Sequence, residues 1–264
     1  MVPRPRTELL LLCAVAWLAL VSVPLAFGGI GLGWDALNHQ IYLGWTADAS
    51  RFDRDLLAAS GQSYQFPYLY WPLYKLVQLE VSGVWAGVVL VSLNLAVIPA
   101  LWMVIRVAIP DSDWYGFAMR WLGVLLAFMS AVALSQFDST SNDLLAGTPL
   151  VWAVALALLP LDGRERSPAA VQRLVALSGL AAGVSVACKL SNGPLALVLP
   201  CLWCLHGMGL RARIAHVAIG GACVLAGFVL CYGYWGWQVY SVFGNPIYPF
   251  YDHLFQGLRP GSAP

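Results

Sequence analysis

The fold class of this chain is decided by residues 9–27, which read LLLLCAVAWLALVSVPLAF. The run carries no charged side chain, and a helix that crosses a bilayer needs about 20 such residues. Arg4 and Arg6 precede it, as basic residues precede the apolar core of a secretory signal peptide. That core is only about 7–15 residues long, however, and no Ala-x-Ala-like cleavage site follows directly here. We therefore expect residues 9–27 to form a retained membrane span.

The composition of the whole chain extends this conclusion. Of the 264 residues, 60% are hydrophobic and 10% are charged, whereas soluble domains carry about 25% charged residues. The net charge of +1 offers no basic surface to a nucleic acid, so we expect no such partner. We predict an all-α integral membrane bundle that forms a single domain over residues 1–264. About seven apolar runs approach the length of a span, namely 9–27, 84–105, 118–136, 143–160, 174–190, 193–208 and 214–234.

The distribution of basic residues predicts the orientation, because cytoplasmic loops carry an excess of Lys and Arg. With the N-terminus in the cytoplasm, the inner side receives Arg4, Arg6, Arg106, Arg120, Arg164, Arg166, Arg173, Arg211 and Arg213. The outer side then receives Arg51, Arg54, Lys75, Lys189 and Arg259, spread over longer loops. This orientation places the loop 28–82, the turn 136–143, the bend 189–192 and the tail 235–264 on the outer side. The polar stretches that are able to carry chemistry thus gather on one face.

The outer loop 28–82 is too long for a simple connection, since most connections have about 4–6 residues. It opens with Gly33-Trp34-Asp35-Ala36-Leu37-Asn38-His39-Gln40-Ile41-Tyr42. We expect two short helices at the membrane surface, over residues 34–47 and 67–79. Asp35 and His39 are four residues apart, which places them on the same helix face. A carboxylate there can accept a proton from a hydroxyl, and a histidine can contact a phosphate; the alternative is a helix face that is merely wet.

Three other stretches carry candidate residues. Asp143 opens a predicted span, where Asn142 and Asp143 are also good N-cap residues. Lys189 lies at the end of an apolar run, and a charge at a membrane boundary suggests a functional site unless it only reaches for headgroups. The tail segment Gly244-Asn245-Pro246-Ile247-Tyr248-Pro249-Phe250 is rigid and aromatic. It suits either a substrate pocket or a plain turn at the membrane surface.

The sequence suggests no metal site from cysteine. Cys201-x-x-Cys204 has the spacing of a metal or redox motif, but it lies in the apolar run Leu-Pro-Cys-Leu-Trp-Cys-Leu with no second ligand pair nearby. We expect a structural role for both cysteines.

The order of these motifs resembles that of bacterial multi-span glycosyltransferases of the GT-C type, which use polyprenyl-phosphate-linked sugars. The resemblance covers nearly the whole chain and rests on Trp34-Asp35-Ala36-Leu37-Asn38-His39, Gln62-Ser63-Tyr64-Gln65-Phe66-Pro67, Ser141-Asn142-Asp143-Leu144-Leu145, Lys189-Leu190-Ser191-Asn192 and Gly244-Asn245-Pro246-Ile247-Tyr248-Pro249-Phe250. It implies a bacterial inner-membrane location, a site at the periplasmic or extracellular face, and a catalytic acidic residue in the first outer loop, which Asp35 matches. The loop lacks an Asp-Asp or Glu-Asp pair, so no cofactor is certain and a divalent metal stays an open alternative. The chain also ends after about seven expected spans, where the resembling proteins continue.

The resulting hypothesis is a membrane glycosyltransferase that moves a sugar from a polyprenyl-phosphate donor to an acceptor. Asp35 is expected to act as the general base or to position the acceptor, and His39 and Lys189 are the expected contacts to the donor phosphate. Further substrate-binding residues are expected to be Tyr64, Asp143, Asn245 and Tyr248. The expected partners are the lipid-linked sugar donor and membrane lipids, while the sequence leaves the oligomeric state undetermined. The alternatives are a transporter or flippase-like protein, and an inactive or accessory membrane subunit.

Overall fold

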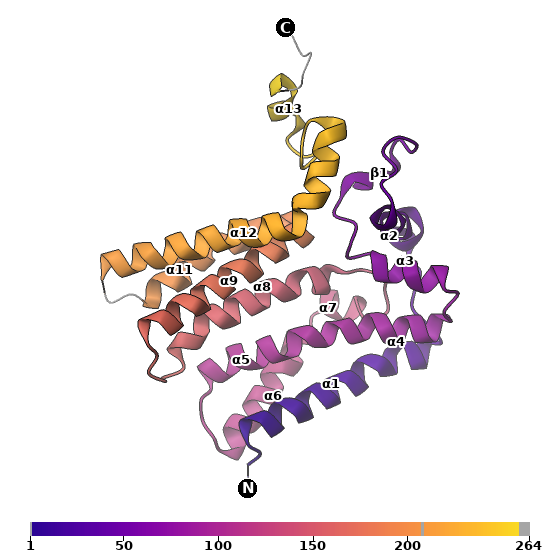
Figure 1. Ribbon diagram of the computed structural model, residues 1–264. Helices are drawn as coiled ribbons and strands as arrows, with labels where there is room; N and C mark the ends of the chain where they lie inside the picture. The colour runs from indigo at the N-terminus through magenta and orange to yellow at the C-terminus, as the bar shows by residue number, and fades with distance from the viewer. Residues whose placement is uncertain (1, 207–208, 259–264) are drawn as a thin grey trace.

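The computed structural model describes residues 2–206 and 209–258 and is a helical bundle (Figure 1). Within those residues, 5 helices are long and apolar enough to cross a membrane. These are Pro5–Phe27, Gly83–Ala108, Asp143–Leu161, Pro168–Cys188 and Leu210–Phe243. Trp114–Phe128 and Leu190–His206 are shorter apolar helices. The predicted all-helical, membrane-type fold is confirmed, whereas the count of seven spans is not.

The elements follow one another mostly as helices, with a single short strand among the described residues. Their bounds are α1 Pro5–Phe27, η1 Ala36–Gln40, α2 Ile41–Asp48, β1 Ala58–Gly61, η2 Gln62–Tyr64, α3 Trp71–Gln78, α4 Gly83–Leu93, η3 Asn94–Val97, α5 Ile98–Ala108, α6 Trp114–Phe128, α7 Ala131–Ser135, α8 Asp143–Leu158, η4 Leu159–Leu161, α9 Pro168–Cys188, η5 Leu190–Asn192, α10 Gly193–Ala196, α11 Leu199–Trp203, η6 Cys204–His206, α12 Leu210–Phe243, α13 Asp252–Phe255 and η7 Gln256–Leu258.

Two of the expected spans do not form one continuous helix of spanning length, and their sequences explain why. The run 118–136 is divided because α6 ends at Phe128 and Ser130 then caps the short helix α7, its hydroxyl accepting a hydrogen bond from the Ala133 N–H at 3.1 Å. The run 193–208 is divided at residues 197–198, just before Pro200, which lacks a backbone donor and stands in the first turn of α11. The last residues of that run, 207–208, lie outside the described residues.

The centre of the bundle is the pair α9 and α12, which pack with backbone against backbone. A Cβ atom added to Gly183 would collide with the Val224 carbonyl oxygen, and one added to Gly227 would collide with the Leu180 carbonyl oxygen. Each helix thus contributes a glycine whose missing side chain lets the backbone of the other helix approach closely, as is common between helices in membranes. α8 joins this pair through buried serines of α9: Ser178 Oγ donates to the Ala153 carbonyl at 2.7 Å and Ser185 Oγ donates to the Ala146 carbonyl at 2.8 Å.

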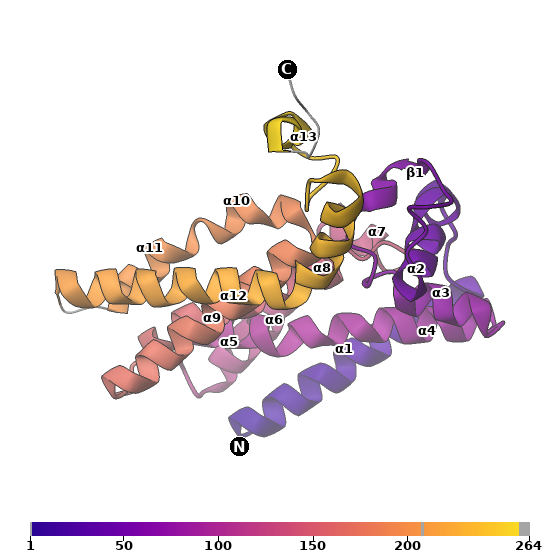
Figure 2. The ribbon, with the colours of Figure 1, turned by 45° about the horizontal axis from the view of Figure 1, so that its top comes forward.

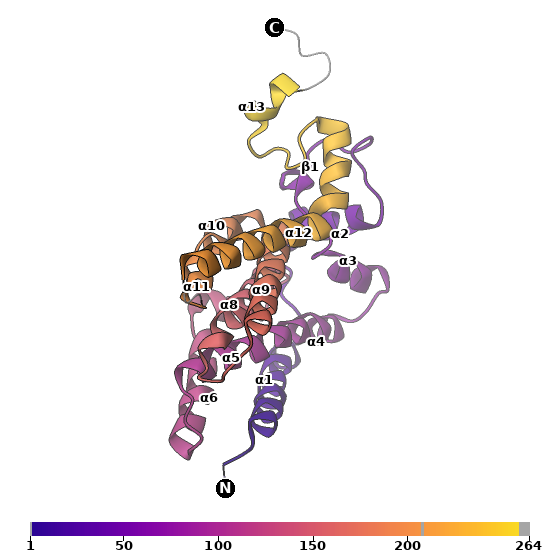
Figure 3. The same cartoon turned by 60° about the vertical axis from the view of Figure 1, so that its left-hand side comes forward.

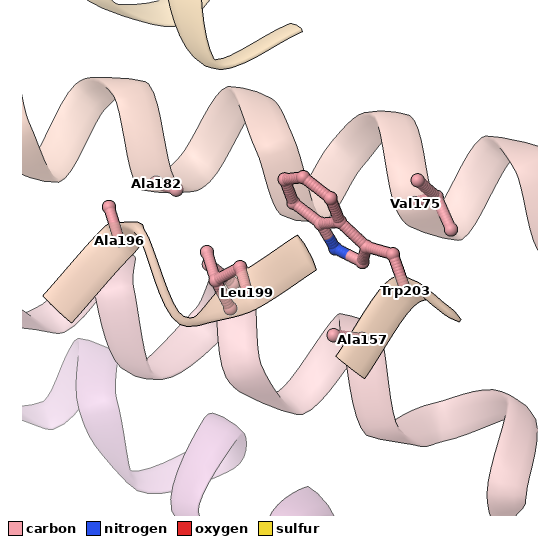
Figure 4. Close-up of a cluster of buried hydrophobic side chains, with 7 residues drawn as sticks. Ala157, Val175, Ala182, Ala196, Leu199 and Trp203 are labelled. Atoms are coloured by element: carbon pink, nitrogen blue, oxygen red, sulfur yellow. The ribbon is translucent and has the colours of Figure 1, made fainter. Parts of the chain in front are cut away.

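The divided helix α10–α11 covers α8 and α9 with a cluster of apolar side chains (Figure 4). Trp203 is nearly fully buried, and its indole N–H donates to Ser178 Oγ at 3.0 Å. The indole N–H of Trp203 therefore has a hydrogen-bond partner although it is buried away from water. The large ring fills space left by the small neighbours Ala153, Ala157 and Ala182.

The elements of the loop 28–82 gather at one end of the bundle. Figures 1 and 2 show α2, α3 and β1 at the same end as the C-terminal part of α12. With 34 residues, α12 is about 50 Å long, which exceeds the roughly 30 Å of a bilayer core. The predicted span 214–234 is therefore part of a longer helix, and the expected tail begins as helix. Figure 3 shows α13 apart from the bundle.

The two short helices predicted in the loop 28–82 are present. The first combines the π-helical turn Ala36–Gln40 with α2, and the second is α3, Trp71–Gln78. They pack closely because Gly44 of α2 meets the backbone of Tyr70. Asp48 of α2 accepts a hydrogen bond from the Trp71 indole at 2.6 Å and pairs with Lys75 of α3.

The opposite end contains a buried ion pair that joins α1 to α6. The side chains of Glu8 and Arg120 are only 2% and 4% exposed. Arg120 donates from Nε to Glu8 Oε1 at 2.7 Å and from Nη2 to Glu8 Oε2 at 2.8 Å, and the Trp102 indole donates to Oε1 at 3.0 Å. Arg120, which the charge distribution assigns to the inner side or its edge, is buried in the bundle at this end.

Candidate functional site

A cavity of about 320 Å³ opens where the elements of the loop 28–82 meet the bundle, and we call it the polar cavity. Its walls come from the loop 28–82, the start of α8, the end of α9, α12 and the C-terminal segment after α12. Six of the predicted site residues line it, namely Asp35, His39, Tyr64, Asp143, Lys189 and Tyr248. Asn245 does not line it. Segments far apart in sequence therefore bring most of the candidate residues together.

Asp35 and His39 lie one turn apart at the cavity wall. The distance from His39 Nδ1 to Asp35 Oδ1 is 3.7 Å, which is too long for a hydrogen bond, and Nδ1 has no other partner among the described residues. The His39 side chain is 8% exposed, whereas that of Asp35 is 64% exposed. Burial lowers the pKa of His39, and the nearby Asp35 carboxylate offsets part of that effect. The histidine is therefore neutral near pH 7 and holds an unused ring nitrogen.

Lys189 and Asp143 form an ion pair at the same cavity. Their side chains are 43% and 49% exposed, so both charges remain open to water and to a ligand. Lys189 is where α9 ends and the chain becomes extended. Asn192 fixes this bend, since its side-chain amide donates to Ser185 Oγ at 2.9 Å and to the Ala146 carbonyl of α8 at 3.2 Å.

Two hydrogen bonds fix the loop 28–82 against the turn before α8. The Gly31 N–H donates to Asp138 Oδ1 at 3.0 Å, and the buried Thr140 hydroxyl donates to Gln40 Oε1. Gln40 follows His39 directly. These bonds therefore set the position of the Asp35–His39 turn relative to Asp143.

An aromatic group closes another side of the cavity. The ring centroid of Tyr64 lies 4.9 Å from those of both Tyr248 and Phe243, and Tyr248 stacks on Phe243 at 4.5 Å. The Trp235 indole donates to the Tyr64 carbonyl at 3.2 Å, which attaches this part of the loop to α12. Such pairs of rings contribute about 0.5–1.5 kcal/mol beyond their buried area.

Asn245, predicted to bind substrate, supports the turn that carries Tyr248. It is fully buried; its amide donates to the Phe250 carbonyl at 3.0 Å, and its side-chain oxygen accepts from the Ile247 N–H at 3.0 Å. Tyr248 and Phe250 both line the cavity, so Asn245 supports the cavity wall without lining it.

Several lining residues were not predicted, among them Gln62, Gln65, Tyr70, Asn142 and Tyr232. Tyr70 lies in the aromatic stretch that the sequence placed at the membrane surface. Burial, followed by the Asp143 carboxylate, raises the pKa of Tyr70 to about 12. Asn142 occupies the N-cap position of α8, as expected, but its side chain makes no capping hydrogen bond and lines the cavity instead.

The acidic residues of the cavity do not form a ready metal site. No group of three or more His, Cys, Asp or Glu side chains that could hold a metal occurs within residues 2–206 and 209–258. Asp143 is also engaged by Lys189.

The arrangement provides an exposed carboxylate, a half-exposed lysine, a neutral histidine and an aromatic wall within one cavity. Comparison of the chain with models of known protein families, with curated proteins and with solved structures finds no match.

Proposed function

We propose that the chain is a membrane glycosyltransferase that moves a sugar from a polyprenyl-phosphate donor to an acceptor hydroxyl. The observation that carries the proposal is the meeting of Asp35 and Lys189 in one cavity at the end of an apolar bundle. Sugar transfer from a lipid phosphate needs a base near the accepting hydroxyl and a cation near the leaving phosphate. The exposure of both side chains leaves them accessible to substrates.

In the proposed reaction the acceptor oxygen attacks the anomeric carbon of the sugar. Asp35 takes the proton of the acceptor hydroxyl, and the bond between the anomeric carbon and the phosphate oxygen breaks. The polyprenyl phosphate leaves with the electron pair of that bond. Lys189 stabilises the charge on the leaving phosphate after exchanging Asp143 for it, and the N–H of neutral His39 donates a hydrogen bond to it. Tyr64 and Tyr248 offer ring faces to the sugar.

The test is turnover of lipid-linked sugars by the purified full-length protein in lipid nanodiscs. Release of polyprenyl phosphate from hexosyl and pentosyl donors is measured with and without a chelator. Loss of a general base reduces the rate by about 10²–10⁴-fold, and we expect this loss for Asp35→Asn. Asp53→Asn is the matched control, because Asp53 lies in the same loop, is 71% exposed, pairs with Arg54 and does not line the cavity.

The proposal fails if Asp35→Asn melts like the wild type and turns over donor at the wild-type rate. Solute flux into vesicles without any glycosylated product would instead favour a transporter. A drop in turnover on chelation would add a divalent metal to the mechanism.

A further inference from the structure

A second pocket lies at the end of the bundle away from the polar cavity. It has a volume of about 300 Å³ and is lined by the last turn of α5, by Pro110 and by the connection between α8 and α9. Figure 1 shows the end of α5 and the α8–α9 connection near each other, on the side opposite α2, α3 and β1. We call it the arginine pocket after Arg106 and Arg164.

The acidic residue that lines the arginine pocket, Asp162, and the one beside Trp102, Glu8, are already engaged. Asp162 binds Arg166 through both oxygens, at 2.6 and 2.8 Å, and lies 3.7 Å from Arg164 in a longer single contact. Glu8 binds Arg120 through both oxygens. Arg106 makes no hydrogen bond or ion pair in the part of the chain that the structure describes. The pocket thus presents two guanidinium groups whose donors are largely unused.

Arg106 is nevertheless held in place by an aromatic ring. Its guanidinium carbon lies 5.0 Å from the ring centroid of Trp102, and the Trp102 indole is fixed by its hydrogen bond to Glu8. A positioned arginine binds phosphate oxygens through parallel hydrogen bonds, which a flexible lysine does not do.

The other walls indicate a lipid. Met103, Val107 and Leu159 are apolar lining residues. α5 and α8 belong to helices that are long and apolar enough to cross a membrane, so the pocket lies where such helices end. Basic pockets at this level between membrane helices bind the headgroups of anionic lipids.

We propose that the arginine pocket binds the phosphate of an anionic phospholipid headgroup through Arg106 and Arg164, with the acyl chains along α5 and α8. This site is independent of sugar transfer in the polar cavity. A bound lipid there joins the α8–α9 connection to α5 and stabilises that end of the bundle.

The test is native mass spectrometry of the full-length protein released from detergent with equal amounts of phosphatidylglycerol and phosphatidylcholine. We expect retention of phosphatidylglycerol, and a basic residue near a membrane surface contributes about fivefold in binding. Arg164→Gln should lose about that factor, and adding Arg106→Gln should lose it again. Arg164 is 70% exposed, so its variant leaves the fold intact.

Arg173→Gln is the matched control, since Arg173 is exposed near the same end of α9 but does not line the pocket. Unchanged retention of phosphatidylglycerol in the double variant, or an equal loss in Arg173→Gln, would overturn the proposal. Complete displacement of the lipid by inorganic phosphate at an equal concentration would also overturn it, because the site would then bind a free anion.

Discussion

The two ends of the molecule each contain an ion pair between distant segments, but the pairs differ in every physical respect. Glu8 and Arg120 are almost fully buried, meet through two parallel hydrogen bonds and are completed by Trp102. Asp143 and Lys189 are about half exposed, and they line a cavity together with an unpaired histidine nitrogen. The first pair has no hydrogen-bonding capacity left for a ligand, whereas the second pair can still bind one.

The comparison separates charge that holds the fold from charge that is free for chemistry. A buried pair whose polar atoms are satisfied has a high cost of disruption, because the remaining charge stays without a partner. A half-exposed pair contributes only about 0–1 kcal/mol to stability, since water replaces either partner. Exposure and unused hydrogen-bonding capacity, rather than charge itself, therefore identify the candidate site.

The largest expected effect comes from breaking the buried pair. Arg120→Ala leaves the Glu8 carboxylate buried and also removes the donor to the Ile109 and Asp111 carbonyls. Removing one partner of such a pair costs about 3–5 kcal/mol. We expect a large fall in the free energy of unfolding in detergent, measured by chemical denaturation, together with loss of any turnover.

The control for this prediction is the double variant Glu8→Leu with Arg120→Met. Replacing both charges with apolar groups of similar size is often neutral, so most of the lost stability should return. If Arg120→Ala were as stable as the wild type, the pair would not hold α1 to α6.

The second prediction concerns the exposed pair. Lys189→Ala should change the free energy of unfolding by no more than about 1 kcal/mol. It should lower kcat/KM for a lipid-linked sugar by about 10²-fold, because a donor to the developing charge is lost. Lys189→Arg keeps the charge and should retain most of the activity. A fall in stability that matches the fall in activity would assign Lys189 to the fold.

The smallest expected effect is a dependence of stability on pH that arises from His39. The pKa of His39 in the folded state is lowered by burial, so the unfolded chain binds a proton more readily. Stability is therefore complete above the ordinary pKa of about 6.5 and decreases as the pH falls below it toward the folded-state pKa. We expect a modest drop in Tm between pH 7 and pH 5.

Two variants isolate this contribution. His39→Gln should reduce the pH-dependent drop in Tm, since it removes the titrating group. Asp35→Asn should enlarge the drop, because the Asp35 carboxylate raises the pKa of His39 and partly compensates burial. Identical pH profiles in all three proteins would show that His39 is not buried as described.

The sequence predicted the polar cavity better than it predicted the lengths of the helices. Asp35, Asp143 and Lys189 follow or precede apolar runs, and helices that alternate in direction bring every second connection to the same end. Hydropathy therefore predicts which loops meet. It does not predict where a run bends, because Ser130 and Pro200 interrupt segments whose composition is apolar throughout.

The unpredicted features depend on contacts between distant residues. In the sequence, Glu8 is one acidic residue near two arginines. Only the packing of α1 against α6 shows that it binds Arg120. Asn142 reads as a capping residue, and the loop around it turns the side chain to the cavity. Asn245 is polar and is therefore predicted to contact a ligand, but it forms hydrogen bonds with Ile247, Phe250 and Asp252 of the same C-terminal segment.

The glycine contact between α9 and α12 has a mechanical consequence for the cavity. Lys189 ends α9 and Tyr232 belongs to α12, so two walls of the cavity are attached to helices that cannot slide past each other without separating. The opposite wall, residues 28–82, is a folded loop held to the turn before α8 by the Gly31–Asp138 and Thr140–Gln40 hydrogen bonds. The loop 28–82 is therefore the wall that can move more easily relative to the others. Any movement of this loop away from α8 has to strain those two bonds, while the contact between α9 and α12 keeps the spacing of Lys189 and Tyr232 constant.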